Sequence, residues 1–225
     1  MCGRFTLFAE YDDILNRFDI EAAIEQDLFQ QSYNIAPSHS VLSVINDGTQ
    51  NRLGYLRWGF VPSWAKDEKV GNKMINARAE TLVEKPSFRH AFKHRRCLII
   101  ADSFYEWKKG PNKTKTPMRI KLKTNDLFAM AGIWERWKSP EGNSLFSCSI
   151  ITTTPNELMK DIHDRMPVIL NKEDEQAWLD PSLNDVSKVS HLLKPLAADN
   201  MEAHEVSSLV NSPRNNSPNL IQKRC

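Results

Sequence analysis

A cysteine directly follows the first methionine, in the stretch MCGRF. Aminopeptidases remove Met when the next side chain is small, so we expect the mature chain to begin at Cys2 with a free α-amine. The amine titrates near ~8 and the thiol near ~8.5, so both are nucleophiles close to neutral pH. Together they would capture an aldehyde twice, first as an imine and then as a five-membered thiazolidine. The alternative is that Cys2 is merely a small residue after Met1, and the rest of the chain must decide.

Two ionisable residues lie where core packing alone would not place them. Glu106 stands among aromatic residues in FYEWKK, and strand alternation would put it on the face of Phe104, opposite Tyr105 and Trp107. Apolar surroundings raise the pKa of a carboxyl group and suit it to proton transfer, whereas a solvent-facing glutamate has no such role. His163 in DIHDRMP follows a helical segment, whose dipole favours a cationic imidazole that could transfer protons, bind phosphate or act as a cap.

Amide and guanidinium side chains occur in two further short stretches. INARAET places Asn76, Arg78 and Glu80 at alternate positions, and YNIAPS places Asn34 just before a proline turn. Such groups can orient a substrate or bind phosphates. Turn chemistry alone also explains Asn34.

Composition limits the class of protein. A chain of 225 residues with 40% hydrophobic and 26% charged residues is typical of one substantial globular domain. It lacks an apolar run of ~18 residues and a basic segment leading into an apolar one, so we expect no membrane span, no secretory signal and an intracellular location. Four widely spaced cysteines without a CxxC pair predict neither a zinc site nor a disulfide framework, and Cys97 and Cys148 lie in strand-like runs as core thiols.

Two basic stretches stand out against a net charge of only +2, and they span residues 85–96 and 108–115. Either stretch could contact phosphates. A solvated helix face and a hairpin tip explain them equally well.

The elements that must position these residues are mainly strands. Apolar residues at positions 11, 14, 15 and 18 have a helical spacing and predict a short helix within 9–18, and a turn at Asp47 and Gly48 predicts a hairpin between 40–46 and 50–60. Further strands are predicted at 97–109, 116–123, 127–137 and 143–154. Helices are predicted after Thr154 as N-cap and after Asn171 as N-cap. The short loops favour antiparallel pairing of the strands. These elements predict one α+β domain over 1–211. The polar tail over 212–225 is predicted to follow the surface or to be partly disordered.

The order of the motifs resembles that of a known family. MCGRF, YNIAPS, WGFVPSW, INARAET, FYEWKK, DIHDRMPVIL and EVSSLVN occur in the order seen in SRAP proteins, the SOS-response-associated peptidases. The resemblance implies a compact mixed fold, a curved mainly antiparallel sheet or small barrel flanked by helices. It also implies recognition of abasic sites in single-stranded DNA, including those at junctions with duplex, and a covalent thiazolidine crosslink that protects the lesion.

The resemblance assigns roles to particular residues. Cys2 would be the nucleophile, Glu106 the general acid and base in crosslinking and slow reversal, and His163 a proton-transfer group that stabilises the sugar. Asn76 would orient the N-terminus. The DNA-contacting side chains would be the phosphate-binding Arg78, Arg4, Asn34 and Arg165 and the base-stacking Trp107 and Trp64, although some relatives carry two adjacent aromatics where this chain has SWAK.

The resemblance implies no metal or organic cofactor, and we expect a monomer in the cytoplasm, associated with the nucleoid. Three alternatives stay open. An N-terminal-nucleophile amidohydrolase also begins with Cys and Gly, and would use the free amine as the base for the thiol. A thiol peptidase, in its modest form, would remove its own Met1. A non-covalent DNA-binding module would not need Cys2.

Overall fold

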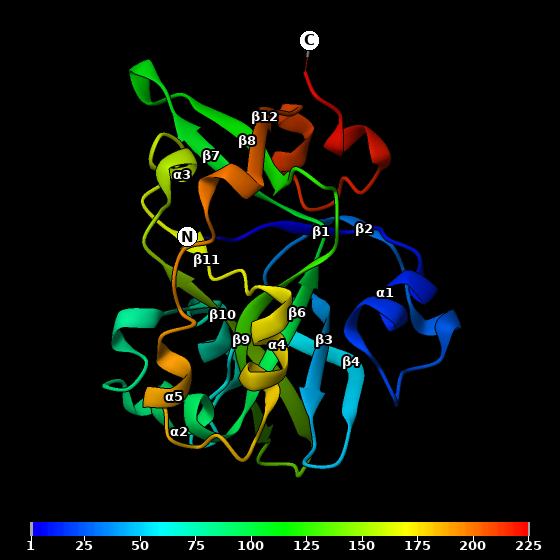
Figure 1. Ribbon diagram of the computed structural model, residues 1–225, viewed down its shortest axis with the longest axis vertical. Coiled ribbons are helices and arrows are strands. Elements are labelled where there is room, and N and C mark those ends of the chain that lie inside the picture. Colours follow the sequence, from blue (N-terminus) through cyan, green and yellow to red (C-terminus); the bar gives the residue numbers. More distant parts are fainter. Residues whose placement is uncertain (1, 225) are drawn as a thin grey trace.

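Two sheets, one open and one closed, form the framework of the described chain, residues 2–224, in the computed structural model (Figure 1). The open sheet has the strand order β12-β8-β7-β1-β2. Its strands are β1 Phe5–Leu7, β2 Ser32–Ile35, β7 Ser103–Lys109, β8 Lys115–Leu122 and β12 Met201–Glu205. All of its pairings are antiparallel, as the short loops predicted.

The second sheet closes on itself because β10 pairs with β4 on one side and with β9 on the other. The resulting five-stranded barrel consists of β3 Ser40–Asn46, β4 Asn51–Trp58, β6 Arg96–Ala101, β9 Phe128–Lys138 and β10 Ser144–Thr153. Two short strands, β5 Asn76–Arg78 and β11 Met166–Pro167, extend it along the C-terminal half of β10. The parallel pairs β10–β4 and β10–β5 make the sheet mixed, so the predicted α+β fold with a small barrel is confirmed.

Short helices cover the strands. They are α1 Tyr11–Phe18, α2 Pro86–His94, α3 Glu157–Lys160, α4 Lys172–Leu179 and α5 Ser187–Ser190, with 3-10 turns η1 Gln26–Leu28, η2 Glu68–Lys73, η3 Ala79–Thr81, η4 Pro111–Lys113, η5 Ala198–Asn200, η6 Ser208–Asn211 and η7 Pro218–Ile221. The predicted amphipathic helix is confirmed as α1, which buries Tyr11, Ile14 and Phe18. None of the helices described between residues 2 and 224 is long and apolar enough to cross a membrane.

One predicted helix cap is wrong and another is confirmed. Asn156, not Thr154, is the N-cap of α3, because its side-chain oxygen accepts a hydrogen bond from the Met159 amide at 2.9 Å. Asn171 is the N-cap residue of α4 as predicted, although its amide donates to Asp174 and caps no backbone N–H.

The predicted strand over 97–109 divides into β6 of the barrel and β7 of the open sheet. Asp102 lies at the joint, where its carboxylate accepts hydrogen bonds from the Phe8 amide at 2.5 Å and from the Thr6 hydroxyl. A carboxylate cannot continue into an apolar barrel without partners. The chain therefore passes from the barrel to the open sheet at Asp102, and the same residue holds the N-terminal strand β1 in place.

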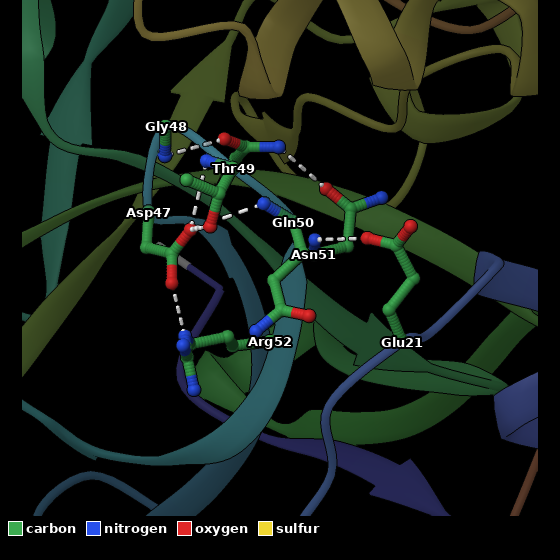
Figure 2. A network of polar contacts seen from close by, with 8 residues as sticks. Glu21, Asp47, Gly48, Thr49, Gln50, Asn51 and Arg52 are labelled. Atoms are coloured by element: carbon green, nitrogen blue, oxygen red, sulfur yellow. Dashed lines mark hydrogen bonds and ion pairs between the residues drawn. The ribbon is translucent and has the colours of Figure 1, made fainter.

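The predicted hairpin between β3 and β4 is confirmed, and its turn is closed by its own polar side chains (Figure 2). Asp47 accepts hydrogen bonds from the amides of Thr49 and Gln50, at 2.9 and 3.0 Å, and from the Arg52 guanidinium. Because these donors stabilise the anion, the pKa of Asp47 lies well below its usual range. Every charge at this tip therefore has a partner.

Buried side chains fill the barrel and fasten the helices to it. Cys97 and Cys148 are fully buried free thiols, as predicted for core cysteines. The buried Arg96 donates to backbone carbonyls of Phe92 at 3.1 Å, Trp178 at 2.6 Å and Asp180 at 2.6 Å. One guanidinium thus closes the C-terminal ends of both α2 and α4.

The polar segment after residue 211 lies along the open sheet. Leu220 is buried, and the Asn216 side chain accepts a hydrogen bond from the Tyr33 amide at 2.7 Å. Asn34 donates to the Ser212 and Asn215 carbonyls at 2.9 and 2.7 Å. The segment 212–224 therefore follows the surface of the domain, while the boundary at 211 stays a prediction and Cys225 lies outside the described residues.

Candidate functional site

The register of the open sheet brings the N-terminus to Glu106. Phe5 pairs with Phe104 across β1 and β7, and the Tyr105 amide donates to the Arg4 carbonyl at 2.9 Å. Continuing that antiparallel register places Gly3 opposite Glu106, with Cys2 beside it. The predicted removal of Met1 concerns a residue outside those that the structure describes.

Asn76 holds the backbone of Cys2 in place. It begins β5, which is aligned by its parallel pairing with β10, and its side-chain amide donates to the Cys2 carbonyl at 2.9 Å. Its own oxygen is buried and has no hydrogen-bond partner among the described residues. The barrel edge therefore presents an unused acceptor beside the N-terminal residue.

Glu106 is a buried carboxyl group, only 2% exposed. Burial raises the pKa of Glu106 to about 7, so the group exchanges its proton near neutral pH. The alternative of a solvent-facing glutamate is therefore wrong. Both faces of β7 are covered at this point, since Phe104 and Tyr105 are buried as well.

The thiol of Cys2 is also buried. Burial raises the pKa of the Cys2 thiol well above its usual range, and the negative charge of Glu106 raises it further. A thiol in this state is protonated at neutral pH and needs a base before it can attack. Glu106 is the nearby group with a suitable pKa.

His163 lies next to this carboxyl group, with its Nε2 atom 4.0 Å from Oε2 of Glu106. The turn after α3 positions it, because the His163 amide donates to the Met159 carbonyl at 2.8 Å. Burial lowers the pKa of His163, so the expected cationic imidazole is wrong: α3 is a single turn, and desolvation outweighs its dipole.

Three groups surround the Nδ1 atom of His163. The Arg165 amide donates to it at 3.0 Å, the exposed Asp164 carboxylate lies 2.9 Å away and the Arg165 carbonyl lies 3.3 Å away. These contacts fix the orientation of the ring and leave its Nε2 atom on the side of Glu106.

The two arginines predicted to meet phosphates differ in their surroundings. Arg78 ends β5 and is exposed, two residues beyond Asn76. Arg165 donates to both oxygens of Glu80, at 2.7 and 2.9 Å, and to the Thr152 carbonyl at 2.6 Å. Glu80 can reach Arg165 because the strand ends at Arg78 and the chain turns into η3.

Arg4, Asn34 and Trp107 form an adjoining cluster on the open sheet. Arg4 is buried, donates to the Asn34 side chain and the Val210 carbonyl at 2.7 Å each, and lies 5.8 Å from the centre of the Trp107 ring. Its Nε atom has no partner among the described residues. The Trp107 indole donates to the Asn211 side chain at 2.8 Å. The sequence indicated Asn211 only through the EVSSLVN motif, which does not reveal that it orients this tryptophan.

Trp64 is 67% exposed on the loop between β4 and η2. The loop is held firmly: Gly59 has φ +137°, and a Cβ there would lie 2.9 Å from the Gly71 carbonyl oxygen. The Val61 amide also donates to the Ser147 hydroxyl at 2.9 Å. The loop therefore presents the Trp64 side chain to solvent from a fixed backbone position.

The structure thus brings Cys2, Asn76, Glu106 and His163 together and places the Arg4 cluster beside them. Trp64 lies on a separate loop. Among residues 2–224 there is no group of three or more His, Cys, Asp or Glu side chains that could hold a metal ion.

Comparison with known proteins agrees with the motif order. The sequence profile of "SOS response associated peptidase (SRAP)" matches residues 1–213. The abasic site processing protein YoqW of Bacillus subtilis is 62% identical over 99% of both chains, and HMCES of Rattus norvegicus is 32% identical over 98% of this chain and 75% of its own. A solved structure of a Bacteroides thetaiotaomicron protein is 29% identical, covers all of both chains and superposes with a TM-score of 0.89. The chain therefore belongs to the SRAP family.

Proposed function

We propose that this protein processes abasic sites in DNA by covalent capture at Cys2. The observation that carries the proposal is the position of Cys2 beside a buried Glu106 whose pKa is about 7. The names of the relatives YoqW and HMCES, both abasic site processing proteins, point to the same substrate. The ring-opened deoxyribose of such a site carries the aldehyde that an N-terminal cysteine would capture.

The reaction divides into two additions. After Met1 is removed, the free amine of Cys2 adds to the aldehyde carbon, and the carbinolamine loses water to form an imine. The thiol then adds to the same carbon and closes the thiazolidine, so that one water molecule is released overall. Both steps need protons moved at neutral pH, which is the work of a general acid and base.

Glu106 is the group that would move those protons. Protonated, it would assist loss of water from the carbinolamine; ionised, it would take the proton of the Cys2 thiol. The Nε2 proton of His163 would stabilise the ionised carboxylate or the sugar oxygen. The unused oxygen of Asn76 would accept a hydrogen bond from the α-amine and aim it at the aldehyde.

The DNA would lie across the same face. Arg78 is exposed beside the site and Arg4 is a buried cation without a carboxylate partner among the described residues, so both would attract phosphates. Trp107 and Trp64 would stack on bases. Asn34 and Arg165 stay predicted contacts, and their described hydrogen bonds suit residues that position the surrounding backbone.

The finer parts of the proposal concern the form of the DNA and the life of the crosslink. We infer a preference for single-stranded DNA, also at junctions with duplex, a monomeric protein, action at the nucleoid in the cytoplasm, self-removal of Met1 and slow reversal assisted by Glu106. The adduct-forming step would be lyase-like in chemistry.

The test is to incubate purified protein with single-stranded DNA that contains one abasic site, and to follow it by intact mass and denaturing electrophoresis. We expect a heat-stable adduct that lacks Met1, forms without borohydride and is absent for Cys2→Ala. Cys148→Ala is the matched control, since it removes another fully buried thiol and should keep the adduct. No adduct from a chain shown to begin at Cys2 would refute covalent capture, and a glutaminase assay would then test the amidohydrolase alternative.

A further inference from the structure

The hairpin that joins β7 to β8 carries four lysines and no acid. They are Lys108, Lys109, Lys113 and Lys115, and the next acidic residue after Glu106 is Asp126. All four are exposed, and within residues 2–224 none of them takes part in an ion pair. This hairpin is a concentrated positive charge that the fold leaves uncompensated.

The geometry of the hairpin makes that charge unfavourable for the free protein. Lys109 pairs directly with Lys115 across the two strands, and like charges in that position repel. Lys113 also has φ +61° in the turn, a conformation that side chains other than glycine rarely adopt. A sequence selected only for stability would place an acid or a glycine at one of these positions.

The other basic stretch of the chain differs in this respect. In and beside α2, Arg95 forms an ion pair with Glu135, and the charge of Lys93 acts on Asp185. Two positive charges in and beside α2 therefore act on acidic groups within the protein. Among residues 2–224 the hairpin lysines form no ion pair, which favours a partner outside the protein.

The hairpin begins at the candidate site. Lys109 follows Glu106 by three residues on the same strand, and its charge lowers the pKa of His163. Figure 1 shows the loop between β7 and β8 projecting clear of the body of the domain. At a rise of ~3.3 Å per residue, Lys109 lies about 10 Å from Glu106 and the tip about 20 Å away.

We propose that this hairpin binds the phosphates of the damaged DNA strand on one side of the lesion. It rests on the proposed function, because the distances are counted from an abasic site held at Cys2. At these distances the lysines would reach phosphates within a few nucleotides of the lesion. The contact is with the backbone and reads no sequence.

The test measures DNA binding in the Cys2→Ala background, where no thiazolidine can form. Removing Lys108, Lys113 and Lys115 together as K108Q/K113Q/K115Q should weaken binding and flatten the slope of log affinity against log salt by about 2, since each phosphate contact on a single strand contributes ~0.7. The matched control K85Q/R89Q/K93Q removes the same charge from α2 and should keep the wild-type slope. Melting temperatures establish that both variants are folded.

A second arm locates the contact. Removing the nucleotides on one side of the abasic site should abolish the difference in binding between wild type and the hairpin variant, while removing those on the other side should not. An unchanged slope, or an equal change in the α2 control, would overturn the proposal.

The two proposals fail separately. If the wild-type chain forms no adduct but the hairpin variant still loses slope, covalent capture is wrong and the hairpin surface stands. If the adduct forms and the slope is unchanged, the hairpin proposal alone is lost.

Discussion

The barrel and the open sheet differ in the charged groups that they bury or pair. At the barrel, Glu135 is paired with Arg95 and Asp47 with Arg52. In the open sheet, Glu106 is buried with a pKa of about 7, and Arg4 is buried without a carboxylate partner among the described residues. Ionising a buried carboxyl group costs free energy of folding. The sheet that carries Cys2 therefore also carries a carboxyl group that titrates near neutral pH.

The largest expected effect is that of Glu106→Gln in the open sheet. Loss of a general acid and base should slow adduct formation by about 10²- to 10⁴-fold. The same change should stabilise the protein above neutral pH. Because burial raises the pKa of Glu106 to about 7, the folded wild type holds a proton that the unfolded chain releases, and its stability falls as pH rises from ~4.3 to ~7.

Quenched single-turnover gels measure the rate, and denaturant titration at pH 5 and pH 8 measures the free energy of unfolding. At pH 8 the variant's free energy of unfolding should exceed that of the wild type by on the order of 3 kcal/mol. Glu175→Gln is the matched control, since Glu175 is also buried but is paired with Arg17, at 2.7 Å, in α1. It should leave the rate of adduct formation unchanged. A normal rate for Glu106→Gln would remove Glu106 from the proposed mechanism.

The barrel should show the reverse pattern. Ile99 is fully buried in β6, and Ile99→Ala should lower the free energy of unfolding by about 2–5 kcal/mol because it leaves a cavity. The rate of adduct formation per folded molecule should stay that of the wild type. Denaturant titration and single-turnover kinetics measure the two quantities.

Leu28→Ala is the control for the barrel, since Leu28 is 60% exposed and its truncation should change little. If the rate of adduct formation for Ile99→Ala fell by more than the loss of folded protein explains, the barrel core would affect the chemistry of the site as well as its stability.

The same contrast explains which features were predictable from sequence. Cys2 and Glu106 were found because their signals are local: a cysteine after Met, and a carboxylate in an aromatic strand. The burial of Glu106 on both sides of the strand was not predictable, because it depends on the pairing of β1 with β7 across about a hundred residues. The division of the strand at Asp102 has the same origin, since its partners lie in and after β1.

The wrong cap and the wrong charge state also come from tertiary contacts. Thr154 and Asn156 are both good N-cap residues. Asn156 caps α3 because its side-chain amide is also held by a hydrogen bond to the Leu196 carbonyl at 2.8 Å. His163 follows a helix as predicted, yet burial decides its protonation. Local patterns therefore predicted the elements and the reactive residues, whereas long-range packing set their ionisation.

Charge at the barrel's own hairpin should contribute to stability. Asp47→Ala removes the acceptor of the amides of Thr49 and Gln50 and of the Arg52 guanidinium (Figure 2). We expect a lower melting temperature at pH 7, by less than for Ile99→Ala. Because the pKa of Asp47 is depressed in the folded state, its contribution is complete above ~4 and is lost as pH falls, so the difference should shrink in acid. A difference that does not change between pH 7 and pH 3 would contradict this account, and DNA binding should be unaffected throughout.

The smallest expected effect separates the two hairpins most directly. Lys115→Glu replaces the repulsion opposite Lys109 by an attraction, so it should raise the free energy of unfolding by about 0.2–1 kcal/mol while it weakens DNA binding. The matched reversal in the barrel hairpin, Arg52→Glu, faces Asp47 and should instead lower stability without changing DNA affinity. Denaturant titration and salt-dependent anisotropy measure both quantities for both variants. If Lys115→Glu lowered the free energy of unfolding, the hairpin lysines would be stabilising the folded protein. The proposed difference between the two hairpins, one stabilised by its charges and one whose charges bind DNA, would then be wrong.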